Sequence, residues 1–169
     1  MAQRILIGNL ISLATSVFLF WGSISESVKR VYLFGVFECM LLFVAQLFFG
    51  QGAAAVSLLI AAFRNFLLYS GKYTLPHLII VFSGTLFFGI TFNTGGILGL
   101  VPLLATLIFT LTSYFAKTYI KVKLSLFLNL SLWAFYSIII FDFSSALINI
   151  FSLILIVVSI IKHLNKRNV

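Results

Sequence analysis

Seven long apolar runs follow one another along the chain, and short polar or glycine-containing segments separate them. A helix needs about 20 consecutive apolar residues to cross the hydrocarbon core of a bilayer. Turn-forming residues such as Gly50, Gly71, Asn93 and Asp142 stand in the breaks. The pattern therefore predicts seven transmembrane helices. They cover Arg4–Gly22, Val31–Phe49, Gly52–Ser70, Pro76–Phe92, Ile97–Phe115, Val122–Phe141 and Ser144–Ile161.

Composition supports a membrane protein with little mass outside the lipid. The 169 residues are 62% hydrophobic and only 8% charged, and their mean hydropathy is +1.21. A soluble domain of this size cannot hide so much apolar surface from water. We expect an all-α membrane protein whose main partner is the lipid bilayer.

The basic residues fall on one side of the membrane when the seven helices are numbered in order. Arg4 is on the other side, and Arg64 lies within a run. An excess of Lys and Arg marks the cytoplasmic loops, so we expect the amino terminus outside and the carboxyl terminus in the cytoplasm. Anionic headgroups, rather than nucleic acid, account for the net charge of +8. The nine residues on the shared side are Lys29, Arg30, Lys72, Lys117, Lys121, Lys123, Lys162, Lys166 and Arg167.

The first run also has features of a signal peptide, because small residues at Ser23 and Ser25 follow it. Cleavage there would place Lys29 and Arg30 outside and spoil the charge asymmetry. The transmembrane interpretation is therefore favoured.

An internal repeat is indicated by a shift of 94 residues, which superimposes the first three runs on the last three. The fourth run has no common polar face and reads as a lipid-facing linker. An odd linker helix makes the two repeats parallel. We predict a 3+1+3 arrangement, with a first triple-helix bundle at 1–73, a linker helix at 74–96, and a second triple-helix bundle with a basic tail at 97–169.

Glu38 and Arg64 are ionisable residues within predicted spans, where charge is costly and usually finds a partner or lines a cavity. The second and third runs form a hairpin that turns near Gly50, and both residues lie at similar depth, roughly 10 Å from the cytoplasmic edge. We predict that they pair across the hairpin, so that Glu38→Ala destabilises more than Arg64→Ala. The pair is either structural, with Arg64 reaching the interface, or part of an anion or carboxylate subsite.

The last hairpin turns near Asp142, which we expect at the outer rim in water. By the same depth rule Tyr136 faces Asn149, and Trp133 faces Ser152. An aromatic ring beside an amide suits a small polar ligand, although interfacial anchoring and interhelical hydrogen bonding give the same pattern. The residues predicted to bind substrate are Asn9, Glu38, Arg64, Asn65, Asn129, Trp133, Tyr136 and Asn149.

No catalytic motif or metal-ligand cluster stands in the sequence, and the single Cys39 lies within a run. We therefore expect neither an enzyme nor a bound cofactor or metal.

Four parts of the chain carry a family likeness: Leu47–Ala55 with Ala61–Asn65, Leu100–Thr106, Leu132–Tyr136 and the helix end Ile161-Lys162-His163. In this order and spacing they resemble the YgjV-type bacterial inner-membrane proteins over nearly the whole chain. The resemblance implies an inner-membrane location and an architecture similar to the SWEET and PnuC transporters, whose substrates lie between two triple-helix bundles. Asn149 and Trp133 match the Asn and Trp near those substrates.

Two functions stay open at this stage. The first is a small-molecule transporter or facilitator, in which the bundles rock about Pro102 and Gly8 around a central site for a small polar or anionic solute. The alternative is a non-transporting membrane partner with a regulatory or immunity-type role, and a homo-oligomer is compatible with either. A polar cavity between the bundles would favour transport, and a dry interface would favour a partner.

The predicted topology can be tested with single cysteines in a Cys39→Ser background. We expect a cysteine at Asn93 to react with an impermeant thiol reagent in intact cells, and one at Asn168 to react only after the membrane is opened. Three spans separate the two sites, so labelling of both from one side would contradict the seven-span assignment.

Overall fold

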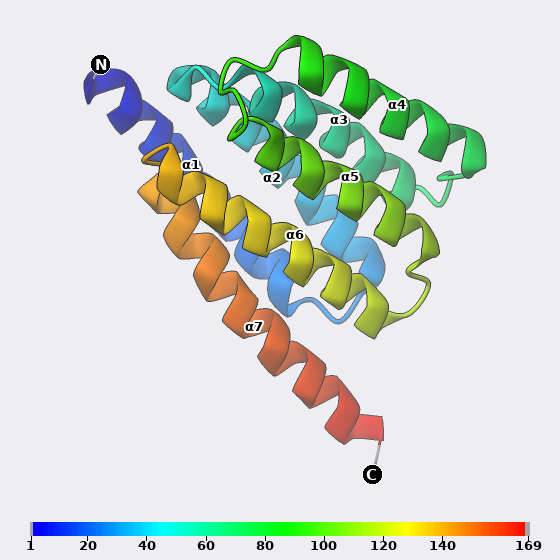
Figure 1. The fold of residues 1–169 in the computed structure, drawn as a ribbon. Coiled ribbons are helices and arrows are strands. Elements are labelled where there is room, and N and C mark those ends of the chain that lie inside the picture. Colours follow the sequence, from blue (N-terminus) through cyan, green and yellow to red (C-terminus); the bar gives the residue numbers. More distant parts are fainter. Residues whose placement is uncertain (1, 168–169) are drawn as a thin grey trace.

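The computed structural model describes residues 2–167, and this part of the chain is helical throughout apart from short connections. Asn168, the proposed labelling site, lies outside the described residues. The seven predicted spans are confirmed as helices, with ends that differ by a few residues (Figure 1). The helices are α1 (Ala2–Ile24), α2 (Val28–Phe49), α3 (Gly52–Tyr69), α4 (Leu75–Thr91), α5 (Leu100–Phe115), α6 (Tyr119–Ile139) and α7 (Phe143–Arg167).

Five of these helices are long and apolar enough to cross a membrane, and the apolar α4 and α5 are shorter, with 17 and 16 residues. The tight turn between α2 and α3 depends on Gly50, which has φ +72° and donates its backbone N–H to the last carbonyls of α2. Glycine adopts this left-handed conformation without steric cost. The local sequence therefore ends α2 and starts α3 within three residues.

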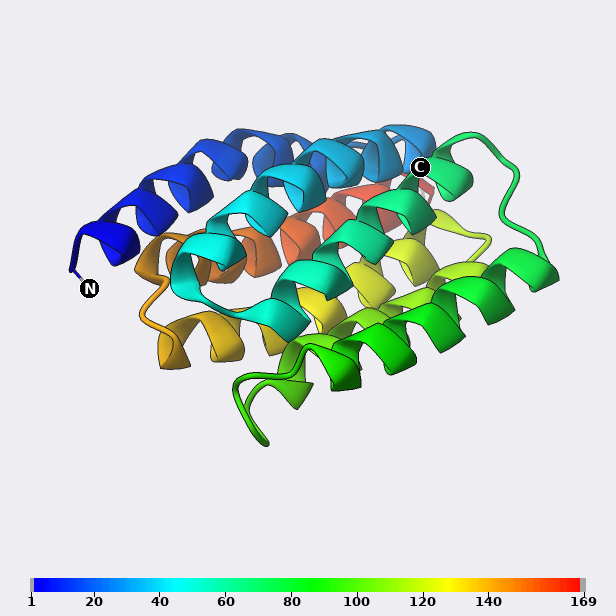
Figure 2. The same cartoon turned by 90° about the horizontal axis from the view of Figure 1, so that it is seen from above.

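Six helices form a closed ring. Each packs on its neighbour in sequence within the groups α1–α2–α3 and α5–α6–α7, and the contacts α3–α5 and α7–α1 join the two groups. Helix α4 lies outside the ring against α3 and α5, at the edge of the molecule in both views (Figures 1 and 2). A Cβ on Gly89 would lie 2.5 Å from the Leu103 side chain, so glycine allows α4 to approach α5 closely.

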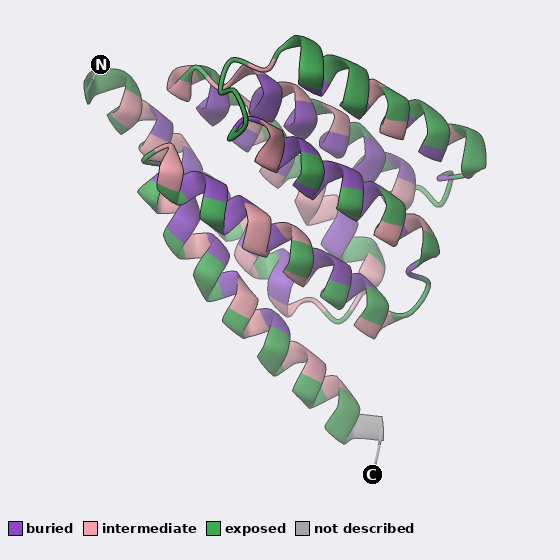
Figure 3. Cartoon of the chain, viewed as in Figure 1, coloured by how far each residue is buried: buried purple, intermediate pink, exposed green. Residues whose placement is uncertain are grey.

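The pattern of buried and exposed residues suits a protein in a membrane rather than one in water (Figure 3). The outward faces expose large apolar side chains such as Ile80, Phe87 and Leu147, whereas small residues such as Ala54 and Ala105 are buried where helices meet. Small residues let helix backbones approach within a bilayer. Only one face of α4 is buried, as the lipid-facing linker interpretation expects, although the division into domains stays a prediction.

The helix directions alternate, so the connections form two groups at opposite ends of the molecule (Figure 1). The α1–α2, α3–α4 and α5–α6 connections lie toward the end at which α7 finishes. Lys29, Lys72, Lys117 and Lys121 belong to these connections or to the first helical turn after them. The basic residues therefore gather at one end of the ring.

Asp142 is not at a solvated rim, and that prediction was wrong. Its side chain is fully buried and accepts hydrogen bonds from the Ser12 hydroxyl (2.9 Å) and the Ser145 backbone N–H (3.0 Å). Asn9 holds the same turn, because its amide donates to the Phe141 carbonyl and accepts from the Ser144 N–H. Burial raises the pKa of the Asp142 carboxyl, and these hydrogen bonds oppose the rise. The turn before α7 is thus fastened to the side of α1.

Lys123, counted above as a loop charge, is also fully buried. Its ammonium group donates to the backbone carbonyls of Gly22 (3.0 Å) and Ser23 at the end of α1. The last carbonyls of a helix have no partner within the helix and carry its negative dipole end. Lys123 therefore caps α1 from α6.

Replacing this capping group should weaken the ring. We expect Lys123→Met to cost roughly 1–3 kcal/mol, because buried carbonyls lose a charged donor. The matched control is Lys121→Met, which removes the same charge from an exposed position on the same helix. Thermal melting in detergent measures both variants, and equal melting temperatures would contradict the capping role.

Candidate functional site

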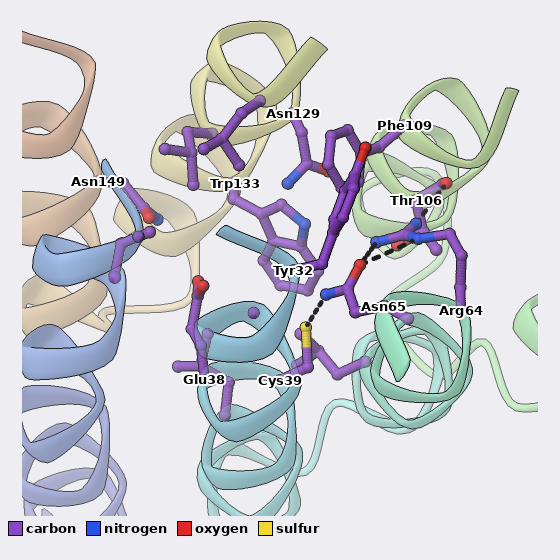
Figure 4. A pocket seen from close by; sticks show the side chains of 18 of the residues that line it. Tyr32, Glu38, Cys39, Arg64, Asn65, Thr106, Phe109, Asn129, Trp133 and Asn149 are labelled. Carbon is purple, nitrogen blue, oxygen red and sulfur yellow. Dashed lines mark hydrogen bonds between the residues drawn. The ribbon is translucent and has the colours of Figure 1, made fainter. Parts of the chain in front are cut away.

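The ring encloses a central cavity of about 50 Å³, lined by residues from all six ring helices but not from α4. The described helices bring six of the eight predicted binding residues to its wall (Figure 4). A space of this size and polarity can hold water. The six are Glu38, Arg64, Asn65, Asn129, Trp133 and Asn149.

Arg64 projects from α3 toward α5 and is almost completely buried, at 2% exposure. Its guanidinium donates twice to the Asn65 amide oxygen, at 3.0 and 3.3 Å, once to the Thr110 hydroxyl at 3.1 Å, and once to the Thr106 carbonyl at 3.4 Å. It also lies over the Phe109 ring, 4.5 Å from the centroid. Arg64 therefore does not reach the membrane interface, and it ties α3 to α5.

The predicted ion pair between Glu38 and Arg64 is not formed. Among the described residues, all four hydrogen bonds of the Arg64 guanidinium go to Asn65, Thr106 and Thr110. Figure 4 places the Glu38 carboxylate toward Asn149 and Trp133, with Arg64 on the opposite side of the cavity. Glu38 and Arg64 were predicted at a similar depth along the hairpin, but their side chains leave their helices in different directions.

Several polar side chains on the cavity wall make no hydrogen bond within the described part of the chain, among them Glu38, Asn129, Trp133 and Asn149. Glu38 and Asn129 keep partial exposure although helices surround them. The Gln46 amide oxygen also lacks a partner, and this side chain is 1% exposed. Buried polar groups normally find partners, so this wall has unused capacity to bind a ligand.

Tyr136 and Asn9, the other two predicted residues, do not line the central cavity. Tyr136 donates its hydroxyl hydrogen to the Gln51 side-chain oxygen (3.1 Å) and packs edge-on against Trp133. It lines a second pocket of about 620 Å³ with Arg4 and Gln51, at the end of the molecule where α2 and α6 finish. The ring of Tyr136 thus lies between this pocket and the central cavity. Asn9 is engaged at the α6–α7 turn.

Sequence reasoning missed several residues of the cavity wall. Tyr32, Thr106 and Phe109 line it, and so does Cys39, whose sulfur accepts a hydrogen bond from Asn65 (3.7 Å). Thr106 and Thr110 lie four residues apart on α5, a spacing that places them on one helical face. That polar face was the available signal, whereas nothing in the sequence distinguishes Tyr32 from other aromatic residues near helix ends.

A family model described as "Bacterial inner membrane protein" (Imp-YgjV) matches residues 6–167. The chain belongs to this family, as the resemblance predicted, and it is a multi-pass protein of the bacterial inner membrane. No curated protein and no solved structure matches the chain.

The geometry reverses the expected order of stability for the two charged residues. We expect Arg64→Ala to cost roughly 3 kcal/mol or more, because its removal leaves several buried acceptors unmatched. Glu38→Ala should cost less, since Glu38 has no partner to orphan, and the double variant should show the sum of both losses. Denaturation of the three variants in detergent provides the measurement. Recovery of stability in the double variant would indicate a direct pair after all.

Proposed function

We propose that this member of the YgjV family is a transporter or facilitator that moves a small polar solute through the central cavity. The observation that carries the proposal is the cluster of Glu38, Asn129, Trp133 and Asn149, whose side chains have no hydrogen-bond partner in the described protein and line one enclosed space. No catalytic step is part of the proposal.

Energetics support a ligand at this place. A polar group buried without a hydrogen bond costs roughly 1–3 kcal/mol in protein mutational data. Ionisable groups within transmembrane segments are also costly and therefore rare. A ring held together only for packing would do better with apolar side chains here. Transient binding of a solute requires polar groups on the cavity wall, and this requirement accounts for the polar side chains there.

Access has to alternate between the two ends of the ring. At one end, the hydrogen bond between Tyr136 and Gln51 separates the cavity from the second pocket. At the other end, Lys123 joins α6 to α1 beside Gly22, which lines the cavity. We infer that transport opens these two contacts in turn, as the two groups of three helices rock against each other.

Orientation is part of the same proposal. The gathering of basic residues at one end supports a cytoplasmic location for that end and for the carboxyl terminus. The pocket beside Tyr136 and Gln51 then faces outward.

Filling the cavity should stop transport without unfolding the protein. We expect Asn149→Phe to abolish flux in proteoliposomes, screened against sugars, nucleosides and vitamin precursors in both charged and neutral forms. Leu147→Phe is the matched control, because Leu147 lies on the same helix and is 71% exposed. The substitution therefore adds the same ring on the lipid-facing side. We expect its flux to match that of the unmodified protein.

Two results would count against the proposal. One is equal flux through both variants, which would place the route elsewhere. The other is absence of flux and of binding for every solute while the protein remains folded, which would favour a non-transporting partner of another membrane component.

A further inference from the structure

The cavity has two chemically different sides, and this difference bears on which solute it takes. Arg64 and Glu38 both line it, but only Arg64 is hydrogen-bonded to other described residues. The inference below rests on the proposed function, because it assigns a substrate class to the same cavity.

Arg64 has little capacity left for a ligand. Four hydrogen bonds occupy its guanidinium, which has five N–H donors. The three acceptor oxygens, from Asn65, Thr106 and Thr110, place partial negative charge around the cation, and the Phe109 ring covers it. A solute anion would have to break this arrangement, so the cavity is a poor anion site despite its arginine.

Glu38 has the opposite character. It accepts no hydrogen bond from any described residue and retains exposed surface, although helices enclose it. Figure 4 shows its carboxylate on the same side of the cavity as Asn149 and Trp133. An ionised carboxylate in an enclosed site within a membrane requires a cation or a strong donor.

The neighbours of Glu38 suit an organic cation with N–H groups. Trp133 presents the aromatic ring type that attracts cations most strongly, and the amide oxygens of Asn129 and Asn149 are acceptors for N–H donors. The unpartnered oxygen of Gln46 adds a further acceptor on the wall. Glu38 carries the one formal charge among the described residues on this side of the cavity, and that charge is negative.

We propose that the cavity binds a small organic cation with a protonated nitrogen, with Glu38 as its counter-ion and Trp133 against its apolar part. The cavity volume of about 50 Å³ restricts the occupant in this closed form to a small group. This replaces the anion or carboxylate subsite that the presence of Arg64 suggested from sequence.

Three probes of nearly the same planar shape test the charge preference: acetamidinium, acetamide and acetate. Purified protein is melted over a millimolar concentration series of each probe, which yields apparent dissociation constants. We expect acetamidinium to bind about tenfold or more tightly than acetamide, because a close charge pair in an enclosed site contributes at least 1.4 kcal/mol. Acetate should give no stabilisation.

Glu38→Gln keeps the size of the side chain and should abolish the preference for acetamidinium. Glu26→Gln is the control, because it removes the same charge from the connection between α1 and α2, outside the cavity. It should leave the preference intact. Equal or tighter binding of acetamide or acetate to the unmodified protein would overturn the proposal, and this comparison holds even if Glu38→Gln fails to fold. An undiminished preference for acetamidinium in Glu38→Gln would also overturn the proposal.

Flux measurements separate this inference from the proposed function. If acetamidinium binds through Glu38 but no solute of the panel crosses proteoliposomes, the cation site stands and transport is wrong. If neutral or anionic solutes cross and acetamidinium does not bind, transport stands and the cation assignment is wrong.

Discussion

Polar groups inside a bilayer cannot turn to water, so each must be matched by another group of the protein or by a ligand. This constraint holds the ring together. Arg64 of α3 binds oxygens of α5, Lys123 of α6 binds the end of α1, and the turn at Asp142 is fastened to Ser12 and Asn9 of α1. Every one of these contacts joins the first three helices to the last three. Apolar packing is nearly neutral between helices and lipid, so these polar contacts specify which helices close the ring.

Among the charged side chains on the cavity wall that the structure describes, Glu38 is the one without a hydrogen-bond partner. The matched charges lie where helices from the two groups meet, whereas Glu38 faces the enclosed space between them. An unmatched carboxylate at that position weakens the empty protein and strengthens the occupied one, since a ligand supplies the missing partner. In the proposed transport cycle, stability and binding would thereby be coupled where the two groups of helices meet.

The sequence predicts the helices and a depth for the site, but it does not predict the direction in which the side chains of the site point. Apolar runs and turn residues predict all seven helices, because bilayer thickness fixes their length. The hairpin rule predicts a common depth for Glu38 and Arg64, and both line the cavity. It fails on their pairing, because depth along an axis says nothing about the angle around it. Asp142 was misplaced for a related reason. It was assigned to water from its position in a turn, whereas Ser12 of the neighbouring helix α1 packs against it and donates a hydrogen bond to its carboxylate.

The two halves of the predicted repeat differ in the residues that they place at the cavity. A shift of 94 residues places Cys39 on Trp133 and Ala55 on Asn149, while Glu38 and Arg64 fall on Leu132 and Val158. The two groups of helices therefore contribute different chemistry to one cavity. The first supplies both charges, and the second supplies Asn129, Trp133 and Asn149. In the proposed function, a solute that contacts both would be held across the boundary between the groups. A rocking motion that separates them would then take its binding site apart, and release on either side would follow from that movement.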